Sequence, residues 1–409
     1  MLAVPAAGTS LSAPALLLVL AILLAGAKLL GELATKVGQP AVLGELVAGV
    51  LLGPSVLGVV DPQVPVIHLL AEVGVVVLLF EIGLETDLRK LLAVGGTAAT
   101  VALAGVALPF GLGLLVARGF GLESLPALVA AAALTATSVG ITARVLSDLG
   151  RLQDRESQVV LGAAVLDDVV GLVILAIVAR LVAGEPPTAG SVALTTLIAF
   201  GFIAVALAVG RFAVPPLFRR LARLGGEQSL AVMGLAVAFL LAAAADAAGS
   251  ALIIGAFTAG LVFAPTPFAR PVEHGVVRLG HFFVPVFFVA VGAAVNVRTF
   301  TDPHVLLVGG ALIAVAIIGK VAAGFAPFWF RGRKLVVGTG MVPRGEVGLI
   351  FAQTGLAAGV LDDGLFSAIT LMVMVTTLVA PPALKALLGK GPAGPGAGDE
   401  GPGELVSEI

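Results

Sequence analysis

Two adjacent aspartates, Asp167 and Asp168, have the positions in this sequence that point most clearly to chemistry. They lie near the middle of an apolar run from about residue 157 to residue 182. A charged side chain at the centre of a membrane span costs about 2.5–3.5 kcal/mol even on the gentler insertion scales. Carboxylate oxygens at that depth are suited to binding a proton or a small hard cation. The pair therefore predicts a functional site inside a membrane.

Composition supports a chain that crosses a membrane many times. Of the 409 residues, 59% are hydrophobic and 12% are charged, and the mean hydropathy is +1.14. Soluble domains carry about 25% charged residues. The net charge of −2 has no nucleic-acid signature, and the absence of cysteine excludes disulfides, thiolate metal sites and cysteine nucleophiles. The four histidines have no metal-ligand spacing, so we expect no cofactor.

The elements that must position the aspartates are transmembrane helices. A span needs about 20 predominantly apolar residues, and by this rule the sequence contains about thirteen. The predicted spans are 12–35, 40–58, 65–84, 92–117, 125–147, 157–182, 190–213, 228–247, 250–265, 277–298, 304–329, 335–357 and 364–388. The Gly/Pro-rich acidic end, 391–409, is predicted to be a disordered tail.

The loops predict the orientation in the membrane. With the N-terminus outside, 18 of the 23 Lys and Arg residues fall on the cytoplasmic side and three fall on the outer side. Lys320 and Arg344 stay within the membrane. The positive-inside rule therefore favours an N-out, C-in topology.

The sequence also repeats itself at an offset of 209 to 211 residues. LGELVAGVLLGP (43–54) matches IGAFTAGLVFAP (254–265), and FEIGLETDLR (80–89) matches VAVGAAVNVR (289–298). The matched segments are seven spans apart. Because seven is odd, the second copy is inverted in the membrane, which is typical of secondary transporters.

Both copies are predicted to contain an interrupted helix. The centre of span 125–147 is a run of Thr, Ser and Gly over residues 135–142. The corresponding span, 335–357, contains Pro343 and Gly345 at its centre. Proline removes a backbone donor, and irregular backbone at this depth must line protein or a cavity. Close helix packing alone would explain residues 135–142, but the matching break with two charges inside it favours function.

Lys320, in the span before the second break, is the predicted partner of the acid pair. Adjacent helical residues diverge by about 100°, so Asp167 and Asp168 cannot share one face. One of them can pair with Lys320 while the other faces the cavity between the interrupted helices. A purely structural ion pair would explain one aspartate and leave the other unexplained.

Six motifs give the chain a specific resemblance. In chain order they are GELVAGVLLGPS, LLFEIGLE, TATSVGITARVL, LDDVVGL, GAFTAGLVFA and PRGEVGLIFA. Together they resemble the bacterial sodium/proton antiporters of the monovalent cation/proton antiporter superfamily, in the branch with an Asp-Asp pair and a membrane lysine. The resemblance implies an all-α fold with inverted repeats and two crossing broken helices. It also implies a homodimer whose protomers each have a dimerisation domain and a mobile core (ion-transport) domain.

The same resemblance implies residue roles. By motif position, Asp168 binds the cation, here Na⁺, and Asp167 pairs with Lys320. Four further residues fall in the two crossovers: Thr137, Ser138, Arg344 and Glu346. The last two are expected to neutralise each other and the helix ends.

The expected organisation follows the repeats. Its parts are a first transmembrane helix on the dimer side (1–36), a repeat 1 dimerisation hairpin (37–91), repeat 1 core helices (92–185), a linker helix (186–225), a repeat 2 dimerisation part (226–300), repeat 2 core helices (301–390) and the tail (391–409).

The function predicted from these features is secondary transport and not enzymatic catalysis. We expect electrogenic exchange of Na⁺ or Li⁺ for H⁺ across a bacterial inner membrane by an elevator-like movement of the core, serving pH and sodium homeostasis. A K⁺/H⁺ antiporter of the same superfamily is the main alternative. A sodium-coupled organic-solute symporter would leave Lys320 unexplained. An intramembrane aspartyl protease would need its aspartates on separate helices.

Overall fold

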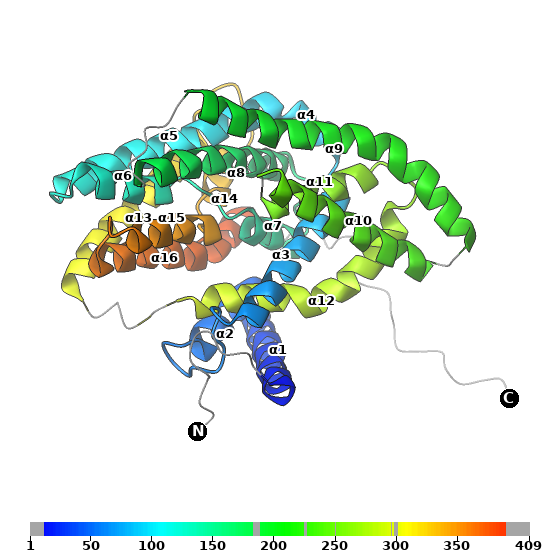
Figure 1. Cartoon of the computed structure of the whole chain (residues 1–409), viewed down its shortest axis with the longest axis horizontal. Helices are drawn as coiled ribbons and strands as arrows, with labels where there is room; N and C mark the ends of the chain where they lie inside the picture. The colour runs from blue at the N-terminus through cyan, green and yellow to red at the C-terminus, as the bar shows by residue number, and fades with distance from the viewer. Residues whose placement is uncertain are drawn as a thin grey trace.

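The structure is a computed structural model, and it describes residues 12–182, 189–224, 227–249, 251–295, 297 and 302–389. The chain is helical nearly throughout these ranges (Figure 1). In order, the helices are α1 (Ala13–Lys36), α2 (Ala41–Leu52), α3 (Pro65–Glu85), α4 (Leu88–Ala93), α5 (Gly95–Gly119), α6 (Ser124–Ala133), α7 (Val139–Asp148), α8 (Arg155–Val182), α9 (Ala189–Leu224), α10 (Glu227–Ala247), α11 (Leu252–Phe263), α12 (Ala269–Ala293), α13 (Pro303–Ala323), α14 (Lys334–Gly340), α15 (Glu346–Ala357) and α16 (Asp363–Leu388).

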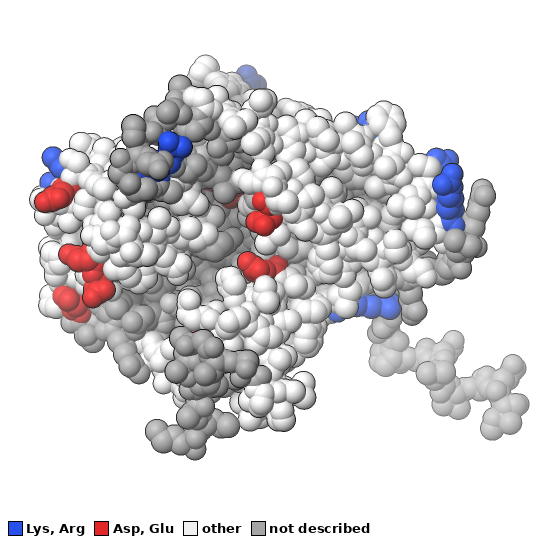
Figure 2. Space-filling view, viewed as in Figure 1, with Lys and Arg blue, Asp and Glu red and all other residues white. Residues whose placement is uncertain are grey.

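Nine helices within the described ranges are long and apolar enough to cross a membrane. Two more predicted spans, α2 and α11, contain only 12 residues each, and the two remaining spans are divided into α6 with α7 and α14 with α15. These elements account for the thirteen predicted segments. Figure 2 shows a largely uncharged face, with charged side chains toward its left and right ends and acidic side chains also near its middle. The chain is an all-α polytopic membrane protein.

The helices form two bundles joined by α9. In the first, which we call the scaffold bundle (α1–α3 and α10–α12), α3 packs on α11 and α12, while α1 packs on α2 and α10 on α11. The second, the crossing bundle (α4–α8 and α13–α16), centres on the contacts of α5 with α8 and α13. The long helix α9 contacts α8 on one side and α10 and α11 on the other, and it runs along both bundles in Figure 1.

Glycine contacts in the scaffold bundle follow the predicted inverted repeat. A Cβ atom at Gly49 would lie 2.7 Å from the Cα of Gly292, and one at Gly83 would lie 2.8 Å from the Cα of Gly260. In the sequence repeat, Gly49 corresponds to Gly260 and Gly83 to Gly292. Exchanging the two repeats therefore turns the Gly49–Gly292 contact into the Gly260–Gly83 contact. The α2–α12 and α3–α11 crossings are thus related by the internal symmetry.

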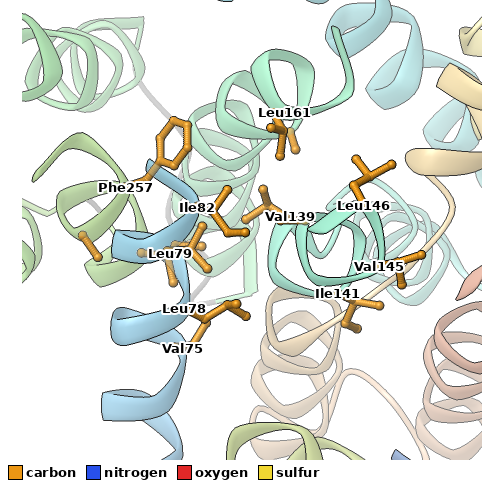
Figure 3. Packing of buried hydrophobic residues seen from close by; sticks show 14 of the residues in the cluster. Val75, Leu78, Leu79, Ile82, Val139, Ile141, Val145, Leu146, Leu161 and Phe257 are labelled. Atoms are coloured by element: carbon orange, nitrogen blue, oxygen red, sulfur yellow. The ribbon is translucent and has the colours of Figure 1, made fainter. Parts of the chain in front are cut away.

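An apolar layer separates the two bundles where α3 faces α7. Figure 3 shows Leu78 and Ile82 of α3 opposite Val139 and Ile141 of α7. All four side chains are buried and belong to one hydrophobic cluster. At this contact the crossing bundle meets the scaffold bundle through side chains that form no directional bonds. Beside it, the side-chain amide of Gln153, between α7 and α8, donates to the carbonyl of Glu85 at the end of α3.

Candidate functional site

The two interrupted helices break within a few residues of the predicted positions. Helix α6 ends at Ala133 and α7 begins at Val139, whereas α14 ends at Gly340 and α15 begins at Glu346. The hydroxyl of Thr135 donates to the carbonyl of Ala132 at 2.7 Å, which satisfies a carbonyl at the end of α6. In the second break, Pro343 has no N–H to continue the helix.

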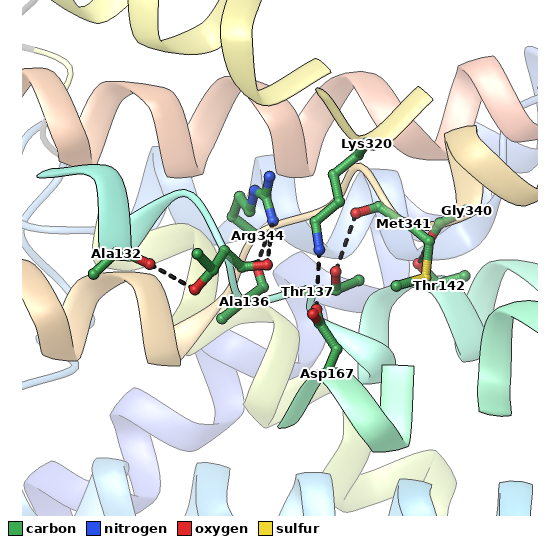
Figure 4. A network of polar contacts seen from close by, with 10 residues as sticks. Ala132, Ala136, Thr137, Thr142, Asp167, Lys320, Gly340, Met341 and Arg344 are labelled. Carbon is green, nitrogen blue, oxygen red and sulfur yellow. Dashed lines mark hydrogen bonds and ion pairs between the residues drawn. The ribbon is translucent and has the colours of Figure 1, made fainter. Parts of the chain in front are cut away.

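The two breaks cross and bond to each other. The amide of Ser138 donates to the carbonyl of Pro343 at 2.8 Å, and the hydroxyl of Thr137 donates to the carbonyl of Met341 at 3.2 Å. Figure 4 shows Thr137 beside Met341 at this crossing. A Cβ atom at Gly345 would lie 2.8 Å from the hydroxyl oxygen of Ser138, so a larger residue there would push the segments apart. The irregular backbone is thus satisfied by protein groups, as a membrane interior requires.

Arg344 is completely buried at the centre of this crossing. Its Nη1 atom donates to the carbonyl of Thr135 at 3.0 Å and to that of Ala136 at 2.7 Å (Figure 4). Both carbonyls follow the C-terminal end of α6, where the helix dipole favours a positive charge. The side chain of Glu346 lies outside the described part of the chain, so its expected pairing with Arg344 stays a prediction.

The two adjacent aspartates of α8 differ in their contacts and in their burial. The Nζ atom of Lys320, on α13, lies 3.0 Å from Oδ2 of Asp167, and both side chains have no exposed surface. Asp168, one position further along α8, is also buried but keeps 5% exposure. The geometry places the lysine on Asp167, and the direction of Asp168 differs by about 100° around the helix.

The polar groups fall into two classes of burial. Asp167, Lys320 and Arg344 are 0% exposed. Three other predicted residues keep a small accessible surface, namely Thr137 with 3%, Ser138 with 5% and Asp168 with 5%. A group that exchanges ions must be reached from outside the protein, and only the second class has accessible surface.

Two hydroxyl side chains of the site were missed by the sequence analysis as specific contacts. Thr142, on α7, donates to the carbonyl of Gly340 at 2.7 Å, and Thr377, on α16, donates to the carbonyl of Arg344. Both hydroxyls satisfy carbonyl oxygens at or near the end of α14 and in the second break. The signal available in the sequence was that Thr142 ends the polar run 135–142 and that Thr377 lies in a long, mostly apolar stretch of α16.

Comparison with known proteins is consistent with this geometry. The family described as sodium/hydrogen exchanger, transmembrane, matches residues 18–390. The high-affinity Na⁺/H⁺ antiporter NhaS3 of Synechocystis is 40% identical over 91% of this chain and 89% of its own length. The Na⁺/H⁺-K⁺ antiporter GerN of Bacillus cereus is 36% identical over 90% of this chain and 95% of its own. The sodium proton antiporter MjNhaP1 of Methanocaldococcus jannaschii has a similar structure, with a TM-score of 0.68, 15% identity, and coverage of 91% of this chain and 97% of that one.

Proposed function

The chain belongs to the sodium/hydrogen exchanger family, and from this we propose that it is a secondary active antiporter that exchanges Na⁺, or Li⁺, for H⁺. The observation that carries the assignment is the difference between the two aspartates of α8. Lys320 is bonded to Asp167, while Asp168, the next residue of α8, is the carboxylate that keeps accessible surface. A transporter of this kind moves its ions without transforming them.

In the proposed mechanism, Asp168 holds either a proton or the cation. A carboxylate oxygen is a ligand that suits a small hard cation, and hydroxyl and carbonyl oxygens of the crossing are further ligands of the same kind. Thr137 and Ser138 are the residues that we assign to this role. Binding of Na⁺ and binding of H⁺ exclude each other at one carboxylate, and this exclusion couples the two fluxes.

Lys320 gives the proposal a second titratable group. When a cation binds beside the pair, it competes with the ammonium for the negative charge of the two aspartates. Release of the Lys320 proton at that step would move two protons for each cation, and transport would then be electrogenic. Arg344, bonded to two carbonyls, holds the crossing together during this exchange.

Access to the site would alternate through movement of the crossing bundle relative to the scaffold bundle. The apolar layer between α3 and α7 supports this idea, because such a surface can slide without breaking hydrogen bonds (Figure 3). We assign the ion-transport core to 92–185 and 301–390 and the dimerisation part to 1–36, 37–91 and 226–300. The segment 186–225, which contains α9, links them.

The proposed setting is a bacterial inner membrane with the N-terminus outside, because 18 of 23 basic residues then face the cytoplasm. We propose a homodimer built through the scaffold bundle, whose helix α1 has several exposed leucines. In that membrane, exchange of Na⁺ for H⁺ would serve pH and sodium homeostasis.

Reconstitution into liposomes tests the proposal. A proton gradient is formed, Na⁺, Li⁺ or K⁺ is added outside, and dequenching of a pH-sensitive dye reports proton movement. We expect responses to Na⁺ and Li⁺, and none from Asp168→Asn purified as the same monodisperse species. Lys320→Ala is expected to transport with altered electrogenicity. Exchange by Asp168→Asn at the wild-type rate would overturn the assignment of the carrier.

The same assay separates the main alternative. The printed name of GerN includes K⁺ as well as Na⁺, which keeps a K⁺/H⁺ exchanger as the second candidate. A K⁺ response equal to or larger than the Na⁺ response would favour that candidate.

A further inference from the structure

Helix α5 contacts Lys320 at a position where it has no side chain. A Cβ atom added to Gly105 would lie 3.2 Å from the Nζ atom of Lys320 and 3.5 Å from its Cδ atom. The ammonium group therefore lies against the backbone of α5 while it bonds to Asp167 on α8. An alanine at this position would force the ammonium to shift by a few tenths of an ångström, because its Cβ atom would lie closer to Nζ than ordinary contacts allow.

One turn further along α5, Pro109 lies against the residue before the lysine. A Cβ atom at Gly319 would be 2.9 Å from both the backbone nitrogen and the Cγ atom of Pro109. Proline has no N–H, so the carbonyl oxygen four residues earlier receives no helical hydrogen bond. That carbonyl belongs to Gly105 itself. This turn of α5 thus has a glycine beside the ammonium, and the carbonyl of that glycine lacks the helical hydrogen bond that residue 109 would otherwise donate.

We propose that the Gly105 carbonyl is a second acceptor for the Lys320 ammonium and receives the ammonium when the pair with Asp167 opens. Gly105 and Pro109 are the positioning residues that provide this acceptor. This inference rests on the proposed function, in which a cation competes with the lysine for the acid pair.

The physical need for such an acceptor follows from the burial of the pair. Removing the partner of a fully buried charge leaves that charge uncompensated, which is strongly unfavourable. The other charged groups around Lys320 are Asp168 of α8 and Arg344 of the second break. Asp168 is the carboxylate that the entering cation uses, and Arg344 is positive. The Gly105 carbonyl on α5, which Pro109 cannot bond to, is an acceptor that neither the cation nor the arginine removes.

Two variants of α5 test the proposal without changing a charged residue. Gly105→Ala fills the space beside Nζ, and Pro109→Ala restores an N–H that occupies the Gly105 carbonyl. Both variants are expected to lower the maximal rate of Na⁺/H⁺ exchange about tenfold, because each removes about one hydrogen bond of a charged donor. The KM for Na⁺ should change less than about twofold. The control is Gly111→Ala in the same helix, because a Cβ atom there meets nothing within 4 Å.

Two readouts distinguish positioning of the lysine from simple packing. In a Lys320→Ala background, Gly105→Ala and Pro109→Ala should cause no further loss, because no ammonium remains to be received. In the wild-type background, the pH profile of the rate should move toward higher pH in both variants, since the lysine stays with Asp167 until it loses its proton. A packing defect would instead lower the rate equally at every pH.

The outcomes also separate this inference from the proposed function. If Asp168→Asn abolishes exchange while Gly105→Ala and Pro109→Ala behave as Gly111→Ala does, the second acceptor is disproved and the antiporter assignment remains. If both α5 variants slow exchange equally at all pH values, the residues serve packing alone, and the inference also fails.

Discussion

The guanidinium of Arg344 donates to the carbonyl of Ala136 at 2.7 Å, although the two residues are 208 positions apart in the chain. The same Nη1 atom also reaches the carbonyl of Thr135 at 3.0 Å. A positive charge from the second repeat thereby satisfies backbone carbonyls exposed by the break in the first. The crossing is thus held by a charge on backbone atoms as well as by hydroxyl contacts.

Replacing Arg344 by Leu should destabilise the protein strongly. The variant leaves the carbonyls of Thr135 and Ala136 buried without the donor, and hydrogen bonds to a charged group contribute about 1.5–3 kcal/mol each. We expect a loss of about 3 kcal/mol or more in the free energy of unfolding, measured by denaturant or thermal unfolding in detergent. Arg331→Leu, at an exposed position, is the control. Equal unfolding curves for the two variants would contradict this role.

The ion pair of Lys320 with Asp167 should show strong coupling in a double-mutant cycle. Lys320→Met leaves a buried carboxylate uncompensated, and breaking a buried pair costs about 3–5 kcal/mol. Adding Asp167→Asn removes the remaining charge, so the double variant should recover most of the lost stability. Lys28→Met is a suitable control, because the Lys28–Glu32 pair is exposed. Additive losses in the double variant would show that the two side chains are energetically independent.

Protons should compete with Na⁺ at Asp168. As the pH falls, more of the carriers hold a proton, so the apparent KM for Na⁺ should rise about tenfold for each pH unit on the acid side. The maximal rate should change far less. The measurement is initial-rate transport at a series of Na⁺ concentrations and pH values in liposomes. The control is Glu123→Gln. Glu123 is the N-cap residue of α6 and is far from the acid pair in sequence, so this variant should keep the same dependence of KM on pH. A KM that does not depend on pH would exclude a shared carboxylate.

Substitution at the symmetric glycine crossings should be costly in both repeats. In Gly83→Ala the new Cβ atom would lie 2.8 Å from the Cα of Gly260, and in Gly49→Ala it would lie 2.7 Å from the Cα of Gly292. Overpacking of this kind costs about 1–3 kcal/mol. The two losses in unfolding free energy should be similar, because the contacts are copies of each other. Gly310→Ala has open space around its Cβ position and should not be destabilised.

Much of the architecture could be predicted because long apolar runs and helix breakers act locally. The thirteen segments and both interruptions follow from such signals. The partners of Arg344 could not be predicted, since its carbonyl acceptors are defined only when two distant segments cross. Gly105 and Pro109 gave no signal either, because glycine and proline are common in membrane helices. Their significance depends on which side chain lies opposite.

The ion pair between α8 and α13 also has a consequence for how the protein is made. Lys320 is synthesised 153 residues after Asp167. At about 5–20 residues per second, α8 waits about 8–30 s before its countercharge exists. During that time both aspartates of α8 have no lysine partner, and a chain interrupted before α13 never acquires one. In the finished protein this single pair therefore links a helix of the first repeat to a helix of the second.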